Sequence, residues 1–197
     1  MRIAVIAIQG NVEEHITAAK RAIEDMDIPA EVIPVRHSGT IPSCDAIILP
    51  GGESTTLGRL IARERMDIEI KDAATSGKAI MGTCAGLVLL AKDGGEQAKR
   101  TGQKLLKVMD IDVNRNAFGS QRNSFEVPLE VAHLDSPYNA VFIRAPAITW
   151  VGPEVEVIAR FEKWIVAAKQ GNILALSFHP ELTQDLRIHH YFFGLVK

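Results

Sequence analysis

The chain has 197 residues, of which 47% are hydrophobic and 23% are charged, a composition typical of a globular protein with a sizeable core. A formal net charge of -2 excludes the basic footprint of a nucleic-acid-binding protein. No apolar stretch approaches the roughly 18 residues that a transmembrane helix needs, and the first residues lack a secretory signal pattern. The two cysteines, Cys44 and Cys84, suggest no disulfide framework. We therefore expect a cytoplasmic protein that binds neither nucleic acid nor a membrane.

The first half of the chain alternates between short apolar runs and helical patterns. The apolar runs, expected to be buried strands, lie at residues 2–8, 30–35, 45–50 and 78–82. The helical patterns, marked by apolar periodicity or by Ser/Thr capping residues, lie at residues 11–26, 54–66 and 85–92. This alternation predicts a mostly parallel sheet with helices on both faces.

From about Lys107 onward the chain changes to strand-like runs separated by turn residues. These runs lie at residues 106–113, 125–133, 139–145, 155–161, 164–170 and 172–178. The last two flank the turn at Gln170-Gly171-Asn172 and should pair antiparallel. A final helix is expected, with Ile188, Tyr191, Phe192 and Leu195 on one face. We expect one α/β domain over residues 1–197, with extra antiparallel strands in the second half.

Polar, glycine-bearing or titratable segments follow several of the expected strands. These segments are "QGN", "GGESTT", "GTCAG" and "HPEL". Because sites in open parallel sheets lie at the carboxyl ends of the strands, these segments are the places to look for chemistry.

The segment "GTCAG" places Cys84 between two glycines, after a strand and before a helix. This is the nucleophile-elbow pattern, in which glycines permit a sharp turn and close helix packing. The N-terminus of the following helix favours a thiolate over a thiol. An inert buried thiol explains the motif equally well, since free cysteine is often buried.

The segment "SFHPEL" supplies a base for such a nucleophile. In an extended chain His179 and Glu181 point to the same side, so that the carboxylate can orient the imidazole. Taken alone, an ordinary loop histidine is the alternative interpretation. His15 and the pair His189-His190 lie in helical patterns, and neither has a strand end with a neighbouring carboxylate.

The segment "LPGGESTT" offers backbone amides after a buried strand. One of them could complete an oxyanion hole with the amide of Ala85, which follows Cys84. The competing interpretation is a phosphate loop, but the G-x-x-x-x-G-K-[ST] pattern is missing, and "IQGNVEEH" lacks the three-glycine dinucleotide fingerprint. No Cys-x-x-Cys pair accompanies Cys84, so that a metal site is not expected.

With "GTCAG", "PGGES" and "FHPEL" in this order, the chain resembles the class I, triad-type glutamine amidotransferases, which have a three-layer, flavodoxin-like fold. Further stretches resemble, within that class, the glutaminase subunits of pyridoxal 5′-phosphate synthase. They are "AIQGNVEEH", "LPGGESTT", "GTCAGL", "RNAFGSQRNSFE", "FIRAP", "VAAKQGN" and "SFHPELT". The similarity extends over essentially the whole chain.

The resemblance implies a role for each matching residue. The triad is Cys84 as nucleophile, His179 as base and acid, and Glu181 as the group that orients His179. Glutamine contacts fall at Gly52, Glu53, Ser54, Arg115, Ile143 and Arg144. By the resemblance, backbone amides of Gly52 and Ala85 are expected to form the oxyanion hole, and Gln9 and Gly10 to touch the partner and organise that hole. Arginines suit a substrate with a carboxylate, although solvated surface arginines are the ordinary alternative.

The implied reaction is hydrolysis of L-glutamine through a cysteine thioester, with no cofactor or metal. The implied partner is the (β/α)₈ synthase subunit, which uses the ammonia to make pyridoxal 5′-phosphate. Two other classes remain open. One is a free-standing cysteine hydrolase or peptidase on the same fold, and the other is a binding module without turnover.

Overall fold

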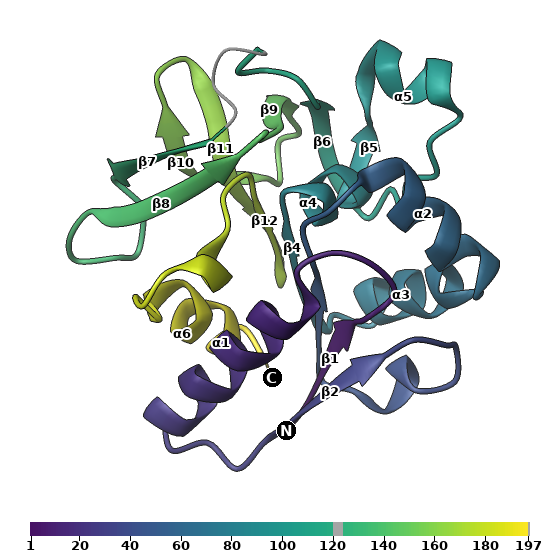
Figure 1. Ribbon diagram of the computed structural model, residues 1–197, viewed down its shortest axis with the longest axis vertical. Coiled ribbons are helices and arrows are strands. Elements are labelled where there is room, and N and C mark those ends of the chain that lie inside the picture. Colours follow the sequence, from purple (N-terminus) through teal and green to yellow (C-terminus); the bar gives the residue numbers. More distant parts are fainter. Residues whose placement is uncertain (120–123, 197) are drawn as a thin grey trace.

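The computed structural model describes residues 1–119 and 124–196. These residues form a ten-stranded mixed sheet with helices on both faces, and a separate two-stranded sheet (Figure 1). The predicted α/β class is confirmed, with parallel strands first and antiparallel strands later in the chain.

Five neighbouring strands form the parallel part of the sheet, in the order β2-β1-β3-β4-β12. They are β1 (Arg2–Ile6), β2 (Glu31–Val35), β3 (Ala46–Leu49), β4 (Ala79–Thr83) and β12 (Ile173–Leu176). Leu49 lies opposite Gly82, and Thr83 lies opposite Leu176. The chain therefore leaves β3, β4 and β12 at the same edge of the sheet.

The sheet continues beyond β12 with mainly antiparallel neighbours. These are β11 (Trp164–Gln170), β9 (Ala147–Val151), β6 (Met109–Asn114) and β5 (Ala91–Asp93), with β10 (Glu156–Phe161) paired to β11. The predicted hairpin is confirmed, because Gln170 pairs with Ile173 across the turn at Gly171. The second sheet joins β7 (Ser124–Leu129) to β8 (Tyr138–Ile143).

Helices cover both faces of the parallel strands (Figure 1). On one face α1 (Val12–Asp25) packs against α6 (Arg187–Phe193), and the other face carries α2 (Ser54–Arg63), α3 (Met66–Thr75) and α4 (Ala85–Leu90). A further helix, α5 (Gly95–Thr101), contacts β6. Along β3, Ile47 and Leu49 face the α2–α4 side, whereas Ala46 and Ile48 face the α1–α6 side. Burial on both faces explains why this strand is an unbroken apolar run.

Several predicted boundaries are wrong. The single helix expected over 54–66 ends at Arg63, because Arg65 adopts a left-handed conformation (φ 59°) before α3 begins. The helix expected over 85–92 ends at Leu90, and the chain continues as β5. Three elements, α3, α5 and β9, were not predicted. The β9 segment, AITWV, contains Ile, Thr, Trp and Val, which are enriched in strands, so that this strand signal was available in the sequence.

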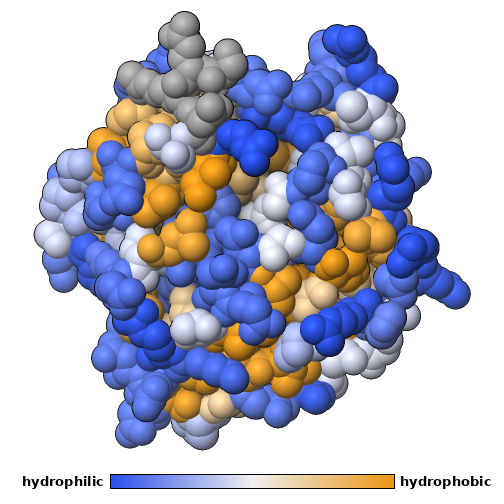
Figure 2. Space-filling view, viewed as in Figure 1, coloured by the Kyte–Doolittle hydropathy of each residue, from blue (hydrophilic) through white to orange (hydrophobic). Residues whose placement is uncertain are grey.

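Within the described part of the chain, no helix combines the length and apolar composition that crossing a bilayer requires. On the face shown in Figure 2, hydrophobic residues reach the surface in separate patches among hydrophilic side chains. The exposed large hydrophobic side chains Ile68, Trp150 and Leu182 belong to three different elements. Such scattered exposure is ordinary for a globular protein.

Gly82 and Gly86 allow α4 to pack directly against β3 and β4. A Cβ atom added to Gly86 would overlap the backbone carbonyl of Leu49, and one added to Gly82 would lie 2.7 Å from the backbone carbon of Gly86. The glycines on either side of Cys84 therefore set the distance between helix and sheet.

We predict that Gly86→Ala destabilises the fold, although helix propensity alone favours alanine by about 1 kcal/mol. Overpacking against β3 should lower the free energy of unfolding by about 1–3 kcal/mol, measured by urea denaturation. Gly194→Ala is the control, because the nearest atoms to its added Cβ lie at 3.3 and 3.4 Å. A Gly86→Ala variant as stable as the parent would contradict this packing argument.

Candidate active site

Cys84 lies at the sharp turn between β4 and α4. Its backbone has φ 49° and ψ −101°, a conformation that non-glycine residues rarely adopt. The amide of Cys84 donates a 2.8 Å hydrogen bond to the carbonyl of Leu176, which fixes the turn to the end of β12. The thiol points to the carbonyl oxygen of Ile143 at 3.8 Å. The turn expected from the flanking glycines is therefore present, and it holds the sulfur at the shared strand edge.

His179 and Glu181 form a buried pair beside this turn. The Nδ1 atom of His179 lies 2.7 Å from Oε1 of Glu181, and the backbone amide of His179 donates to the carbonyl of Val141 at 2.8 Å. The expectation that an extended chain aligns these side chains is wrong, because residues Pro180–Leu182 form a 3₁₀ turn, η2. Pro180 begins that turn, where the fixed φ of proline is favourable.

The pKa values of His179 and Glu181 are shifted in opposite directions. Burial raises the pKa of Glu181, but the neighbouring rings of His15 and His179 outweigh this effect and lower the pKa to about 2. Burial lowers the pKa of His179, whereas its interactions with Cys84 and Glu181 raise it, to about 10. With Nδ1 engaged by Glu181, Nε2 is the ring atom left for chemistry, and it accepts or donates no hydrogen bond within the described residues. A protonated imidazole beside a cysteine stabilises the thiolate form.

The loop after β3 closes against this pair. A Cβ atom added to Gly51 would overlap the His179 ring and lie 3.6 Å from Cβ of Cys84. Gly51 was not among the predicted site residues, although it belongs to the quoted "GGES" motif. Only glycine permits this approach of backbone to imidazole.

Gln9 and Gly10 contact this loop, residues 51–53, which we call the glycine loop. The α-carbon of Gly52 (φ 152°) faces the Gln9 side chain, whose Oε1 accepts a 3.2 Å hydrogen bond from the amide of Glu53. A Cβ atom on Gly10 would overlap the carbonyl oxygen of Gly51. Gln9 and Gly10, expected at a partner interface, thus also support the glycine loop.

Two of the expected glutamine contacts pair with each other. Glu53 caps α2 by accepting hydrogen bonds from the amides of Thr55 and Thr56, which outweigh the effect of burial and lower its pKa to about 2. Arg115 donates to Glu53 Oε1 at 3.1 Å, to Thr55 Oγ1 at 3.0 Å and to Gln103 Oε1 at 2.9 Å. This ion pair fixes Arg115 above the start of α2.

The remaining predicted residues lie on neighbouring segments. Ser54 is the buried first residue of α2, and Ala85 is the first residue of α4, directly after Cys84. Ile143 presents its carbonyl to the Cys84 thiol, and Arg144 follows it in a left-handed conformation (φ 43°). The quoted stretch "RNAFGSQRNSFE" includes residues 120–123, which lie outside the described residues.

Two further polar residues contact Glu181, and a third contacts one of them; none of the three was among the predicted site residues. Asn11 Nδ2 donates to Glu181 Oε1 at 3.2 Å, and His15 Nε2 lies 3.4 Å from Oε2. His15 Nε2 also lies 3.0 Å from Oγ1 of Thr83. One signal in the sequence pointed to His15. It is a titratable residue next to Ile16 and four residues before Ala19, on the apolar face of the predicted helix.

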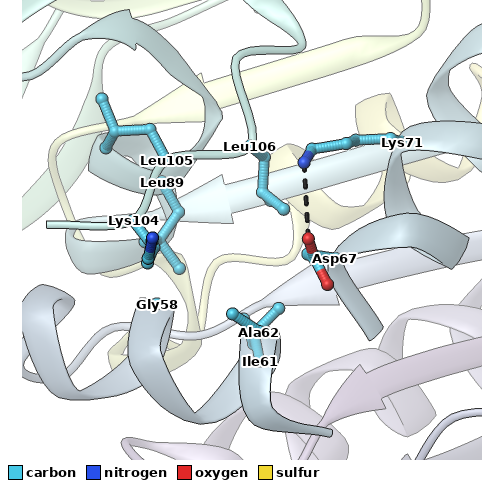
Figure 3. A pocket seen from close by; sticks show the side chains of 9 residues that line it. All are labelled: Gly58, Ile61, Ala62, Asp67, Lys71, Leu89, Lys104, Leu105 and Leu106. Carbon is cyan, nitrogen blue, oxygen red and sulfur yellow. Dashed lines mark hydrogen bonds and ion pairs between the residues drawn. The ribbon is translucent and has the colours of Figure 1, made fainter. Parts of the chain in front are cut away.

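A separate cavity of about 240 Å³ lies beside α2 and α3 (Figure 3). It is lined by apolar side chains, including Ile61, Leu89 and Leu106, and by the ion pair of Asp67 with Lys71. None of the predicted site residues lines this cavity. Among the residues that the structure describes, no group of three or more His, Cys, Asp or Glu side chains is arranged to hold a metal ion.

Comparison with known proteins gives matches over the full chain. A model of the SNO glutamine amidotransferase family matches residues 5–197. The chain is 60% identical to the pyridoxal 5′-phosphate synthase subunit PdxT of Methanosarcina barkeri, over 98% of this chain and 96% of that protein. The subunit of the same name from Archaeoglobus fulgidus is 54% identical, over 99% of this chain and 98% of its own. A crystal structure of a glutamine amidotransferase is 42% identical, with a TM-score of 0.87 and 98% of both chains covered.

The mixed sheet and the strand-edge turn define a class I glutamine amidotransferase fold, as the solved relative confirms. The chain belongs to the SNO glutamine amidotransferase family. The resemblance drawn from the sequence motifs is therefore confirmed.

His189 gives a pH-dependent prediction for stability. Burial, followed by the neighbouring His15, lowers the pKa of His189 to about 3 from an ordinary value of 6.5. Between these pH values the unfolded chain binds a proton that the folded chain does not, so that stability falls as the pH is lowered from 6.5 to 3. We expect His189→Leu to reduce this slope by up to about 1.4 kcal/mol per pH unit, measured by urea denaturation at each pH.

Above about pH 8, where His189 is neutral in the unfolded chain as well as in the folded one, the curves of parent and variant should run parallel. An unchanged acid slope in His189→Leu would contradict the assignment.

Proposed function

We propose that this chain hydrolyses L-glutamine to L-glutamate and ammonia and passes the ammonia to a pyridoxal 5′-phosphate synthase subunit, for vitamin B6 biosynthesis. The observation that carries the proposal is the buried His179–Glu181 pair next to Cys84. Support for the substrate and pathway comes from relatives named as subunits of that synthase, which match at 54–60% identity along nearly their full length. Residues 1–197 then act as one glutaminase domain.

The reaction uses Cys84 and His179 in two steps. In the first, the Cys84 thiolate attacks the side-chain carbonyl carbon of glutamine, and backbone amides of Gly52 and Ala85 bind the resulting oxyanion. His179 then donates its Nε2 proton to the leaving nitrogen, which releases ammonia and leaves a γ-glutamyl thioester. In the second step, His179 takes a proton from water as the water attacks the thioester. Glutamate leaves, and the thiolate and imidazolium are restored.

Glutamine recognition follows from the charges around the glycine loop. Arg115 and Glu53 lie side by side and present opposite charges, which match the α-carboxylate and α-ammonium groups of a free amino acid. Ser54, Ile143 and Arg144 complete the contacts, together with Gly52. The Ile143 carbonyl faces the Cys84 thiol, so that this segment lies beside the reacting amide.

The proposed partner is a (β/α)₈ synthase subunit that docks at Gln9 and Gly10. Ammonia released into water becomes protonated and loses its nucleophilicity, so direct transfer to a partner preserves its reactivity. The cytoplasm is the proposed location. A free-standing cysteine hydrolase or peptidase is not favoured, because the full-length relatives are synthase subunits.

We predict that Cys84→Ala abolishes glutamate release from glutamine in the presence of the synthase subunit. Without the sulfur no thioester forms, and the rate should fall by at least about 10³-fold. The matched control is Cys44→Ala, which removes the other buried thiol, located after residues Ile41–Ser43. Retained turnover in Cys84→Ala, with the control also active, would sink the nucleophile assignment.

We predict that Glu181→Gln leaves a slow but measurable glutaminase. The amide keeps an oxygen for His179 Nδ1 but removes the charge that stabilises the imidazolium, so kcat should fall roughly 10²- to 10⁴-fold. The control is Glu156→Gln, which alters a second Glu–His contact of 2.7 Å, with His133, at an exposed position. A loss as complete as that of Cys84→Ala would show that Glu181 does more than orient His179.

A further inference from the structure

Helix α1 presents two polar side chains to the Glu181 carboxylate. Asn11 is the N-cap of α1, and His15 lies four residues further, on the same side of the helix. Asparagine at this position usually bonds to a free amide of the first turn, yet the Asn11 side chain makes no such capping bond. Its Nδ2 atom instead donates to Glu181 Oε1 at 3.2 Å and lies 3.5 Å from His179 Nδ1. The Asn11 side chain therefore contacts Glu181 instead of capping the first turn of α1.

His15 contacts the other oxygen of the same carboxylate. Its ring is fully buried, and Nε2 lies 3.0 Å from Thr83 Oγ1, at hydrogen-bond distance. The same Nε2 lies 3.4 Å from Glu181 Oε2, a polar contact that is not a hydrogen bond. Thr83 is the buried last residue of β4 and directly precedes Cys84. The contacts therefore connect His179 through Glu181 and His15 to Thr83, and Thr83 is joined to Cys84 by one peptide bond.

Burying the His15 imidazole in the core lowers the stability of the fold unless the ring finds polar partners there. The other buried residues of α1 are aliphatic or alanine, and an imidazole among them loses its hydration. Burial lowers the pKa of His15, against the opposing charge of Glu181, and the ring serves as a hydrogen-bonding group toward Thr83.

We propose that Asn11 and His15 are positioning residues for glutamine hydrolysis: Asn11 holds one oxygen of Glu181 by a hydrogen bond, and His15, anchored on Thr83, confines the other oxygen relative to Cys84. The proposal rests on the proposed function and adds to it a layer behind the triad. Neither residue touches the reacting atoms. Their effect reaches the substrate through the orientation of the His179 ring, which depends on where Glu181 Oε1 lies.

The test compares three variants in the complex with the synthase subunit. His15→Leu removes both polar contacts at similar volume, and His15→Gln keeps an Nε2 donor at a comparable reach. The control is His189→Leu, since His189 is equally buried but makes no hydrogen bond to a described residue. In His15→Leu we expect kcat to fall about 10- to 100-fold with KM changed less than about 2-fold. His15→Gln should recover most of that loss, and His189→Leu should keep the parental kcat.

A second measurement does not require glutamine. The rate of Cys84 alkylation by iodoacetamide reports how well His179 stabilises the thiolate, and mass spectrometry of the Cys84 peptide separates it from Cys44. We expect slower alkylation in His15→Leu than in His15→Gln or His189→Leu, with unfolding temperatures measured in parallel. If His15→Leu does not fold, Asn11→Ala carries the test at a partly exposed position, with slower alkylation and lower kcat expected.

The outcomes separate the two proposals. Parental kcat and alkylation in a folded His15→Leu or Asn11→Ala variant would overturn the positioning role. Equal losses in His15→Leu, His15→Gln and His189→Leu would also overturn it, because they would indicate a packing effect. If the parent protein hydrolyses no glutamine, the proposed function fails, and the alkylation rates still decide whether α1 positions the triad.

Discussion

The buried carboxylate of Glu181 is the constraint around which this part of the molecule is arranged. An isolated charge in a protein interior is strongly unfavourable, so that the surrounding residues must supply polar or positively charged groups. His179 supplies the closest contact at 2.7 Å, and Asn11 supplies an amide donor at 3.2 Å. These groups come from α1 and from the segment after β12. The need to satisfy one charge therefore connects the two ends of the chain.

The sheet makes this arrangement possible by its order and register. Placing β12 beside β4, with Leu176 opposite Thr83, adds a C-terminal strand to the edge of the four N-terminal parallel strands, in the middle of the ten-stranded sheet. Cys84 and His179 then follow neighbouring strands at the same edge, and Gly51 follows β3 on the other side of β4. Parallel strands pointing one way explain how residues far apart in the chain reach one site. Cys84 is held in this site by the close packing of α4 against the sheet, which requires glycine at positions 82 and 86.

The sequence was sufficient to predict the parallel strands, the turn at Cys84 and the proximity of His179 to Glu181. These features depend on local patterns: apolar runs, paired glycines and a two-residue spacing. The predicted reason for the proximity of His179 to Glu181 is wrong, because the chain forms a 3₁₀ turn at Pro180 rather than an extended segment. His15 and Thr83 could not be found in this way. Their role depends on α1 packing over the end of β4, and a histidine on an apolar helix face looks the same whether it fills space or contacts a carboxylate.

The segment from Gln9 to His15 links the two halves of the candidate site. Its loop contacts the glycine loop, through Gln9 Oε1 to the Glu53 amide and through the Asn11 amide to the Gly51 carbonyl at 3.3 Å. Its helix contacts Glu181 through Asn11 and His15. Asn11 belongs to both sets, so a shift of this loop cannot change the glycine loop without also moving a donor to the triad carboxylate. The partner proposed to dock at Gln9 and Gly10 would thereby act on the loop of residues 51–53 and on the orientation of His179 through the same short piece of chain.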